Sequence, residues 1–142
     1  MKKTVGIEGI TFILTLTLIF VSVNLAAQPR ALYMPEDIQV FNDYIDYIES
    51  WSSDSKEQIL EKTAAFFIGR PYVAHTLDSS DVEVLTVNLR EFDCFTFVET
   101  VIALTLTVMT DDPDFNTFTD KLQSIRYRSN EISGYQSRLH YT

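Results

Sequence analysis

The sequence predicts an α+β domain in which two helices come first and one short strand precedes a long central helix. Apolar residues recur every three or four positions over roughly 36–51 and 55–68, which is the spacing of helices that bury one face. A β-rich alternation from Val82 to Leu89 predicts a strand. The nearly uncharged run from Cys94 to Thr110 predicts a buried helix.

Local end signals support the two early helices. Pro35 and the acidic residues after it suit the start of the first helix, because acidic side chains are favourable near a helix N-terminus. Ser and Asp residues near position 54 are capping candidates for the second helix. Gly69 is a plausible C-cap, and Pro71 soon afterwards favours a stop.

The second half of the chain adds a further helix and an irregular tail. Asp114 can cap a helix from Phe115 to about Ile125. The polar, Gly134-containing tail indicates turns and one short hairpin. Because a lone strand cannot form a stable sheet, we expect its partner strands to lie beyond Thr142, and the helix after Cys94 to be only partly covered.

The N-terminus has the three-part layout of a secretory signal peptide. Lys2 and Lys3 precede an uncharged apolar run from Ile10 to Leu25, and Ala26–Ala27 end it. We therefore expect residues 1–27 to be a signal peptide and the protein to be periplasmic or secreted. An uncleaved N-terminal anchor is the alternative, and after cleavage we expect no stable membrane insertion.

Charge and motif content exclude several classes of function. A net charge of −9 argues against nucleic acid as a partner, since phosphates repel an acidic protein. The sequence contains no zinc-ligand spacing and no Gly-rich phosphate loop, so we expect no metal and no cofactor. The acidic cluster at 111–114 is interrupted by Pro113 and indicates a solvated turn.

Cys94 is the one residue whose position indicates chemistry. Asp93 can be the N-cap of the apolar helix, which would place Cys94 in its first turn. The helix dipole and the unpaired first-turn amides there favour a thiolate, the nucleophilic form of cysteine. Glu99 could oppose thiolate formation if it lay close. The alternative is a core thiol among phenylalanines, because free cysteine is often buried.

Three ordered stretches resemble the N-acetylmuramoyl-L-alanine amidase-like family, which consists of NlpC-related, papain-like cysteine hydrolases of peptidoglycan. They are VNLREFDCFTFVETVIALT (87–105), IGRPYVAHTLD (68–78) and ISGYQSRLHY (132–141). The resemblance implies a papain-like NlpC-type fold. Residues 28–142 would be its N-terminal part, mostly helical with a short strand or hairpin and without the C-terminal sheet.

The resemblance also implies site residues. Cys94 matches the nucleophile, and Phe95 stands where a small Thr-like residue is expected. The matched tail block implies that four of its residues bind a peptidoglycan or muropeptide substrate: Tyr135, Ser137, Arg138 and His140.

The general base is left open by the sequence. The family resemblance places a catalytic histidine beyond the matched tail block, His140 is an alternative, and His75 reads as surface or structural. Two functions therefore remain. One is a hydrolase that cleaves the N-acetylmuramoyl-L-alanine amide bond. The other is an inactive fragment or a non-catalytic protein that binds wall fragments.

Overall fold

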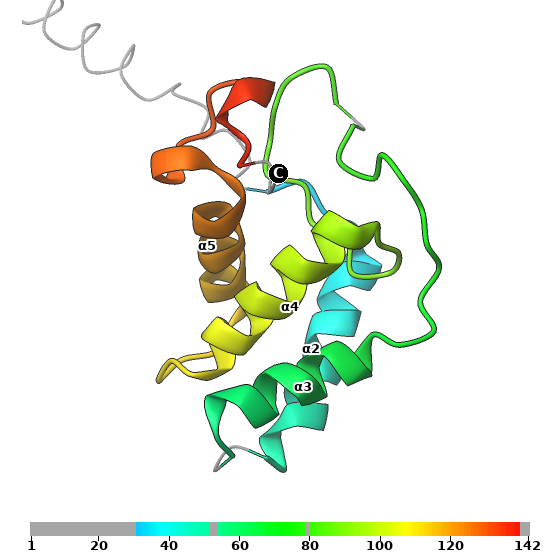
Figure 1. The fold of residues 1–142 in the computed structure, drawn as a ribbon, viewed down its shortest axis with the longest axis vertical. Helices are drawn as coiled ribbons and strands as arrows, with labels where there is room; N and C mark the ends of the chain where they lie inside the picture. The colour runs from blue at the N-terminus through cyan, green and yellow to red at the C-terminus, as the bar shows by residue number, and fades with distance from the viewer. Residues whose placement is uncertain (1–30, 52–53, 79, 140–142) are drawn as a thin grey trace, which may run out of the picture.

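Helices dominate the computed structural model, which describes residues 31–51, 54–78 and 80–139. The predicted signal peptide, residues 1–27, lies outside the described residues. Within the described part, no helix is both long and apolar enough to cross a membrane. The α-helices are α2 (Pro35–Glu49), α3 (Lys56–Phe66), α4 (Cys94–Val108) and α5 (Phe115–Arg126), and two short 3-10 turns follow at Arg128–Asn130 and Tyr135–Ser137 (Figure 1).

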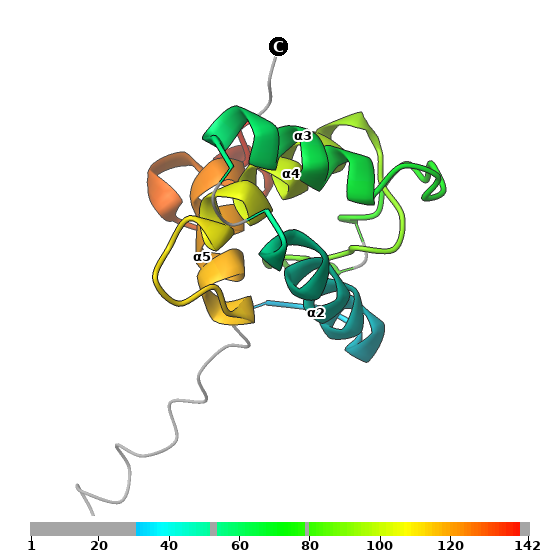
Figure 2. The same ribbon diagram turned by 90° about the horizontal axis from the view of Figure 1, so that it is seen from below.

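Helix α4 occupies the centre of this arrangement. It packs against α3 and α5, and α2 packs against α3 (Figures 1 and 2). A long segment from the end of α3 passes along one side of the molecule before it returns to the start of α4. The expectation of a mostly helical chain with a central apolar helix is confirmed, and each predicted helix forms within a few residues of its expected ends.

The predicted strand at Val82–Leu89 is wrong. Leu85, Val87 and Leu89 are almost completely buried, and Thr86 is also buried. However, the only pairing of this segment within the described residues is a parallel bridge between Leu32 and Thr86. The amide of Leu89 instead donates to the carboxylate of Asp37 at 2.8 Å. The alternating apolar sequence therefore marks a buried segment here, and no sheet forms among the described residues.

The predicted C-terminal hairpin is reduced to one antiparallel bridge. Tyr127 pairs with Arg138, and the amide of Leu139 donates to the carbonyl of Arg126 at 2.7 Å. The residues between them form the two 3-10 turns. This pairing brings the tail back to the end of α5.

Buried threonines reconcile the β-branched sequence of α4 with a helix. The hydroxyls of Thr105 and Thr107 donate to the carbonyls four residues earlier at 2.8 Å, so both of these buried hydroxyls are hydrogen-bonded. Thr105 also donates to Thr63 of α3, whose hydroxyl lies 2.8 Å from that of Tyr44 in α2. Burial raises the pKa of Tyr44 to about 12. These hydroxyl contacts connect the three helices inside the core.

Aromatic side chains contribute two clusters to the core, beside its aliphatic residues. The first links α2 to α5 through Phe41, Phe115 and Phe118, with ring centroids 5.4–5.8 Å apart. The second passes from Phe67 to Phe92 and then to Phe97, at 5.2 and 5.9 Å. These separations and angles are those of edge-to-face and offset packing. The second cluster connects the end of α3 to the start of α4.

The carboxylate of Asp37 fixes the segment that leads into α4. Asp37 is fully buried and accepts hydrogen bonds from the amides of Met34 and Leu89 and from Nε of Arg90, at 2.9, 2.8 and 3.1 Å. The first turn of α2 is thereby tied to residues more than fifty positions later.

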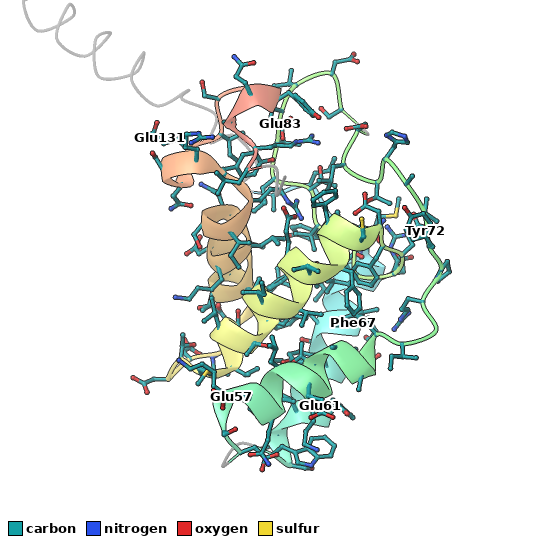
Figure 3. The ribbon with its side chains drawn as sticks, viewed as in Figure 1. Glu57, Glu61, Phe67, Tyr72, Glu83 and Glu131 are labelled. Atoms are coloured by element: carbon teal, nitrogen blue, oxygen red, sulfur yellow. The ribbon has the colours of Figure 1, made fainter. Side chains whose placement is uncertain are left out.

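Glu83 fixes the tail in the same manner. Its carboxylate accepts from Nε and Nη2 of Arg138 at 2.8 and 2.9 Å and from the hydroxyl of Tyr127 at 2.5 Å. Figure 3 shows Glu83 beside the last turns of the chain. Burial raises the pKa of Glu83, but the hydrogen bonds from Arg138 and Tyr127 outweigh it and leave the pKa below its ordinary value.

One face of α4 remains uncovered. Five large apolar residues at spacings of three and four are between 36 and 47% exposed, so they lie along a single face of the helix. The expectation that α4 is only partly covered is confirmed. We call this set the apolar stripe: Phe95, Val98, Ile102, Leu106 and Met109.

The buried Asp37 carboxylate predicts a large effect of a nearly isosteric change. We expect Asp37→Asn to lower the free energy of unfolding by about 3 kcal/mol, because an amide NH₂ would face hydrogen-bond donors and Arg90 would lose its partner. Urea unfolding measures this. Asp43→Asn, at an exposed position of the same helix, should change it by less than about 0.5 kcal/mol. Equal effects of the two variants would contradict this role of Asp37.

The lowered pKa of Glu83 predicts an acid-dependent contribution to stability. A carboxylate whose pKa is lower in the folded than in the unfolded protein stabilises the fold at pH values above its unfolded pKa, ordinarily 4.5. This stabilisation is lost as the pH falls through the folded pKa. Glu83→Gln should therefore cost about 1–2 kcal/mol at pH 7, and the difference from the parent should shrink below pH 4.5. Glu131→Gln, at an exposed position, is the control. A pH-independent difference for Glu83→Gln would refute the linkage.

Candidate functional site

Cys94 is the first residue of α4, and its side chain is exposed. Asp93 caps the helix as predicted: its carboxylate accepts from the amide of Thr96 at 2.8 Å, and Thr96 Oγ1 accepts from the amide of Asp93 at 2.9 Å. This reciprocal pair fixes where the helix begins. The alternative of a thiol buried in the core is therefore wrong.

A hollow of about 320 Å³ opens beside Cys94. The start of α4 forms one side, and the segment at 72–78, the end of α5 and the C-terminal tail form the others. Figure 3 shows Tyr72 on this segment, next to the start of α4. We call it the Cys94 hollow, and it is lined by Tyr72, Ala74, His75, Leu77, Asp78, Asp93, Cys94, Phe95, Thr96, Glu99, Arg126, Tyr135, Arg138 and Leu139.

A second hollow, of about 430 Å³, lies on the other side of Cys94. Its lining is mainly apolar and includes Phe67, Phe97 and Val98. Cys94 and Tyr72 line both hollows. The thiol therefore lies where two concave surfaces meet, which suits a substrate that extends to both sides of the reacting bond.

Glu99 is close to the site, but its charge is compensated. Its Oε2 accepts from Nε of Arg126 at 2.7 Å, and the side chains are only 5% and 2% exposed. Arg126 also donates through Nη1 to the carbonyl of Thr86 at 2.6 Å. From the sequence, Glu99 could have opposed thiolate formation as an unpaired carboxylate. In the structure it forms an ion pair with Arg126.

The structure brings two of the four predicted substrate-binding residues to the hollow. Tyr135 and Arg138 line it, and the guanidinium of Arg138 lies 5.0 Å from the Tyr135 ring centroid. Ser137 does not line it, because its hydroxyl donates to the carbonyl of Gly134 at 2.6 Å and accepts from the Ser133 amide at 3.1 Å. His140 lies outside the described residues.

Arg138 is held firmly by acidic partners. Burial lowers the pKa of its guanidinium, but the hydrogen bonds and charge of Glu83 outweigh burial and raise the pKa above its ordinary value. The guanidinium also reaches Asp78 at 3.4 Å. The guanidinium of Arg138 is therefore held in place at the side of the Cys94 hollow by Glu83 and Asp78.

His75 also lines the hollow, which sequence reasoning did not indicate. Its Nδ1 lies 3.2 Å from Asp78 Oδ2, and its side chain is 84% exposed. The backbone of His75 has a φ of 65°, a conformation that non-glycine residues seldom adopt. His75 thus sits at the mouth of the hollow, where solvent reaches it freely.

Sequence reasoning also missed Arg126, which lies 2% exposed between helices. A signal was present: Arg126 continues the four-residue spacing of Phe118 and Leu122 on the buried face of α5. A cation in that register predicts a buried partner. Within the described residues, no cluster of three or more His, Cys, Asp or Glu could hold a metal ion.

The chain is similar to several solved structures. Structures of an N-acetylmuramoyl-L-alanine amidase from Bacteroides uniformis are 43% identical to this chain, with TM-scores of 0.57 and 0.56. They cover 61% of this chain and 36% and 35% of their own. A structure described as a putative xylanase from Bacteroides fragilis is 42% identical over 56% of this chain and 34% of its own, with a TM-score of 0.53.

The chain thus spans about a third of the length of these solved structures. Comparison with curated proteins gives no match. Residues 62–142, which include all of α4, α5 and the tail, match the family described as N-acetylmuramoyl-L-alanine amidase-like. This match extends over more than half of the sequence, and the chain belongs to the N-acetylmuramoyl-L-alanine amidase-like family.

Proposed function

We propose that this protein takes part in peptidoglycan turnover as a cysteine hydrolase that cleaves the N-acetylmuramoyl-L-alanine amide bond. The observation that supports this most strongly is the exposed thiol of Cys94 at the capped start of α4, beside a concave surface. Family membership and the amidase description of the structural relatives support the substrate class. The overall fold we propose is the papain-like, NlpC-related one.

The proposed reaction proceeds in two steps. Cys94 Sγ attacks the lactyl carbonyl carbon, the C–N bond breaks, and the alanine nitrogen takes a proton and leaves as an amine. Water then attacks the thioester, which releases the muramic acid carboxylate and returns the thiol. Backbone amides of the first turn, which precede the first intrahelical hydrogen bond, would stabilise the oxyanion.

The side chains around the hollow divide between binding and support. Tyr135 and Arg138 line it, and we propose that they contact the substrate. We assign Ser137 to holding the turn of the tail, because its hydroxyl is used by Ser133 and Gly134. His140 remains a candidate for substrate contact.

The general base is proposed to be a histidine other than His75. The His75 side chain is 84% exposed and that of its partner Asp78 is 52% exposed, so neither is buried beside Cys94. We expect the base in the region that the solved relatives have and this chain does not span, with His140 as the alternative within this sequence.

The carboxylates of the hollow argue against the glycosidase chemistry that the xylanase description of one relative would bring. Glycosidases generally need two carboxyl groups that flank the bond to be cleaved. Asp93 caps α4, Glu99 is paired with Arg126, and Asp78 contacts His75 and Arg138. Each carboxylate is thus committed to a partner, whereas the thiol is exposed.

Two further proposals concern location and completeness. We propose that residues 1–27 direct export, so that the protein acts in the periplasm or outside the cell. We also propose that residues 28–142 are the N-terminal part of the catalytic domain. The apolar stripe of α4 would then pack against a counterpart of the region that this chain does not span in its solved relatives.

The nucleophile assignment predicts the behaviour of two single-atom changes. In the longest product that the gene encodes, Cys94→Ala and Cys94→Ser should each lower cleavage of soluble muropeptides by at least about a thousandfold, measured by chromatography of the released peptide. Ser124→Ala, at an exposed position of α5, should leave cleavage unchanged. Cleavage that persists in Cys94→Ala would overturn the assignment, and binding without cleavage by the parent would favour the non-catalytic function.

A further inference from the structure

The first turn of α4 places a large aromatic residue directly beside the proposed nucleophile. Phe95 follows Cys94 in this helix, lines the Cys94 hollow and is 46% exposed. Of the five residues of the apolar stripe, Phe95 is the one that lines this hollow. A molecule bound beside the thiol would therefore meet Phe95, but not the other four residues of the stripe.

The charged side chains around the hollow are mostly bound to one another. Glu99 forms an ion pair with Arg126. Asp78 contacts both His75 and Arg138. Charges that are already paired attract a small neutral group weakly, so they discriminate poorly between uncharged side chains of a substrate. Such discrimination falls to the apolar part of the lining, which gains from burial and consists of Tyr72, Ala74, Leu77, Phe95 and Leu139.

Phe95 has little freedom to move away from the thiol. The hydrogen bonds between Asp93 and Thr96, at 2.8 and 2.9 Å, fix the backbone of the first turn on both sides of Phe95. In a helix, a large side chain is restricted to two χ1 rotamers. The hollow itself, about 320 Å³, is near the lower end of the range of about 300–1,000 Å³ for small-molecule sites. The room next to the thiol is therefore limited, and an apolar residue helps to limit it.

The substrate has a small apolar group on each side of the bond to be cleaved. The lactyl group of muramic acid carries one methyl, and the alanine carries the other. The peptide beyond the alanine adds amide and carboxylate groups, which are costly to bury against an apolar wall. The Cys94 hollow has the more polar lining, whereas the second hollow is mainly apolar. The peptide side thus suits the Cys94 hollow, and the alanine is its residue nearest to the thiol.

We infer that Phe95 forms the wall against which the side chain of the first peptide residue packs, and that it limits this side chain to about the size of a methyl group. Phe95 is then a specificity-determining residue that favours alanine over valine at this position. This role rests on the proposed function and goes beyond it, because it names the residue that selects the amine side of the scissile bond.

The test compares two substrates on the longest product that the gene encodes. They are N-acetylmuramoyl-L-alanyl-D-isoglutamine and its L-valyl counterpart, and chromatography of the released dipeptide gives kcat/KM for each. The parent should favour the alanyl substrate by about tenfold or more, since single methyl or methylene groups in a close-fitting pocket change rates by about 10–200-fold. Phe95→Ala should raise cleavage of the valyl substrate and bring the two values within about threefold of each other. Partial unfolding cannot produce such a gain.

Two variants and a third substrate serve as controls. Ile102→Ala removes another residue of the apolar stripe, which is 37% exposed and lines a separate hollow beside Leu60. It should leave the preference for alanine unchanged, and so should Phe95→Tyr, which keeps the ring. The third substrate has a glycolyl in place of the lactyl group and so lacks the methyl on the acyl side. Its kcat/KM relative to the alanyl substrate should be the same in the parent and in Phe95→Ala.

The outcomes separate this role from the proposed function. An unchanged preference for alanine in Phe95→Ala, no preference in the parent, or a change confined to the glycolyl substrate would overturn the role of Phe95. If Phe95→Ala cleaved neither peptide substrate, isothermal titration in the Cys94→Ala background would compare the same two ligands. A ratio of Kd values that moves towards the valyl ligand supports the role, and an unchanged ratio overturns it. No cleavage of the alanyl substrate by the parent would instead count against the proposed function.

Discussion

The start of α4 is the constraint on which the rest of the site depends. Asp93 and Thr96 exchange hydrogen bonds at 2.8 and 2.9 Å, so the helix begins at Cys94 and at no neighbouring residue. A shift by one position would rotate the thiol by about 100° around the axis, towards the core or away from both hollows. The exposed thiol, the buried position of Glu99 and the apolar stripe all follow from this register.

Three charged side chains then hold irregular segments against that helix. Asp37 binds the amide of Leu89, a few residues before Cys94. Arg126 joins α5 to Glu99 of α4 and to the carbonyl of Thr86. Glu83 holds the tail through Arg138. All three contacts join residues far apart in the sequence. They replace the backbone ladder that a sheet would supply, and so the surroundings of Cys94 are shaped by a few specific side chains.

Sequence reasoning predicted what depends on local pattern. The four helices and the caps at Asp93 and Asp114 follow from spacing and end signals that each lie within a few residues. The sequence left open whether the thiol of Cys94 is exposed or buried, and the structure has it exposed. The prediction failed at Val82–Leu89, where an alternating apolar sequence forms no strand, because a partner strand is a property of the fold and not of the segment. The pairing of Glu99 with Arg126 was missed for the same reason.

Cys94 is proposed to be the nucleophile of an amide hydrolase, and trapping of an acyl-enzyme is the sharpest test of that role. The longest product that the gene encodes would be mixed with N-acetylmuramoyl-L-alanyl-D-isoglutamine, quenched in acid and analysed by peptide mass spectrometry. We expect an N-acetylmuramoyl thioester on the peptide that contains Cys94, together with release of the dipeptide. Dipeptide release without any modification of Cys94, and undiminished in Cys94→Ala, would contradict it.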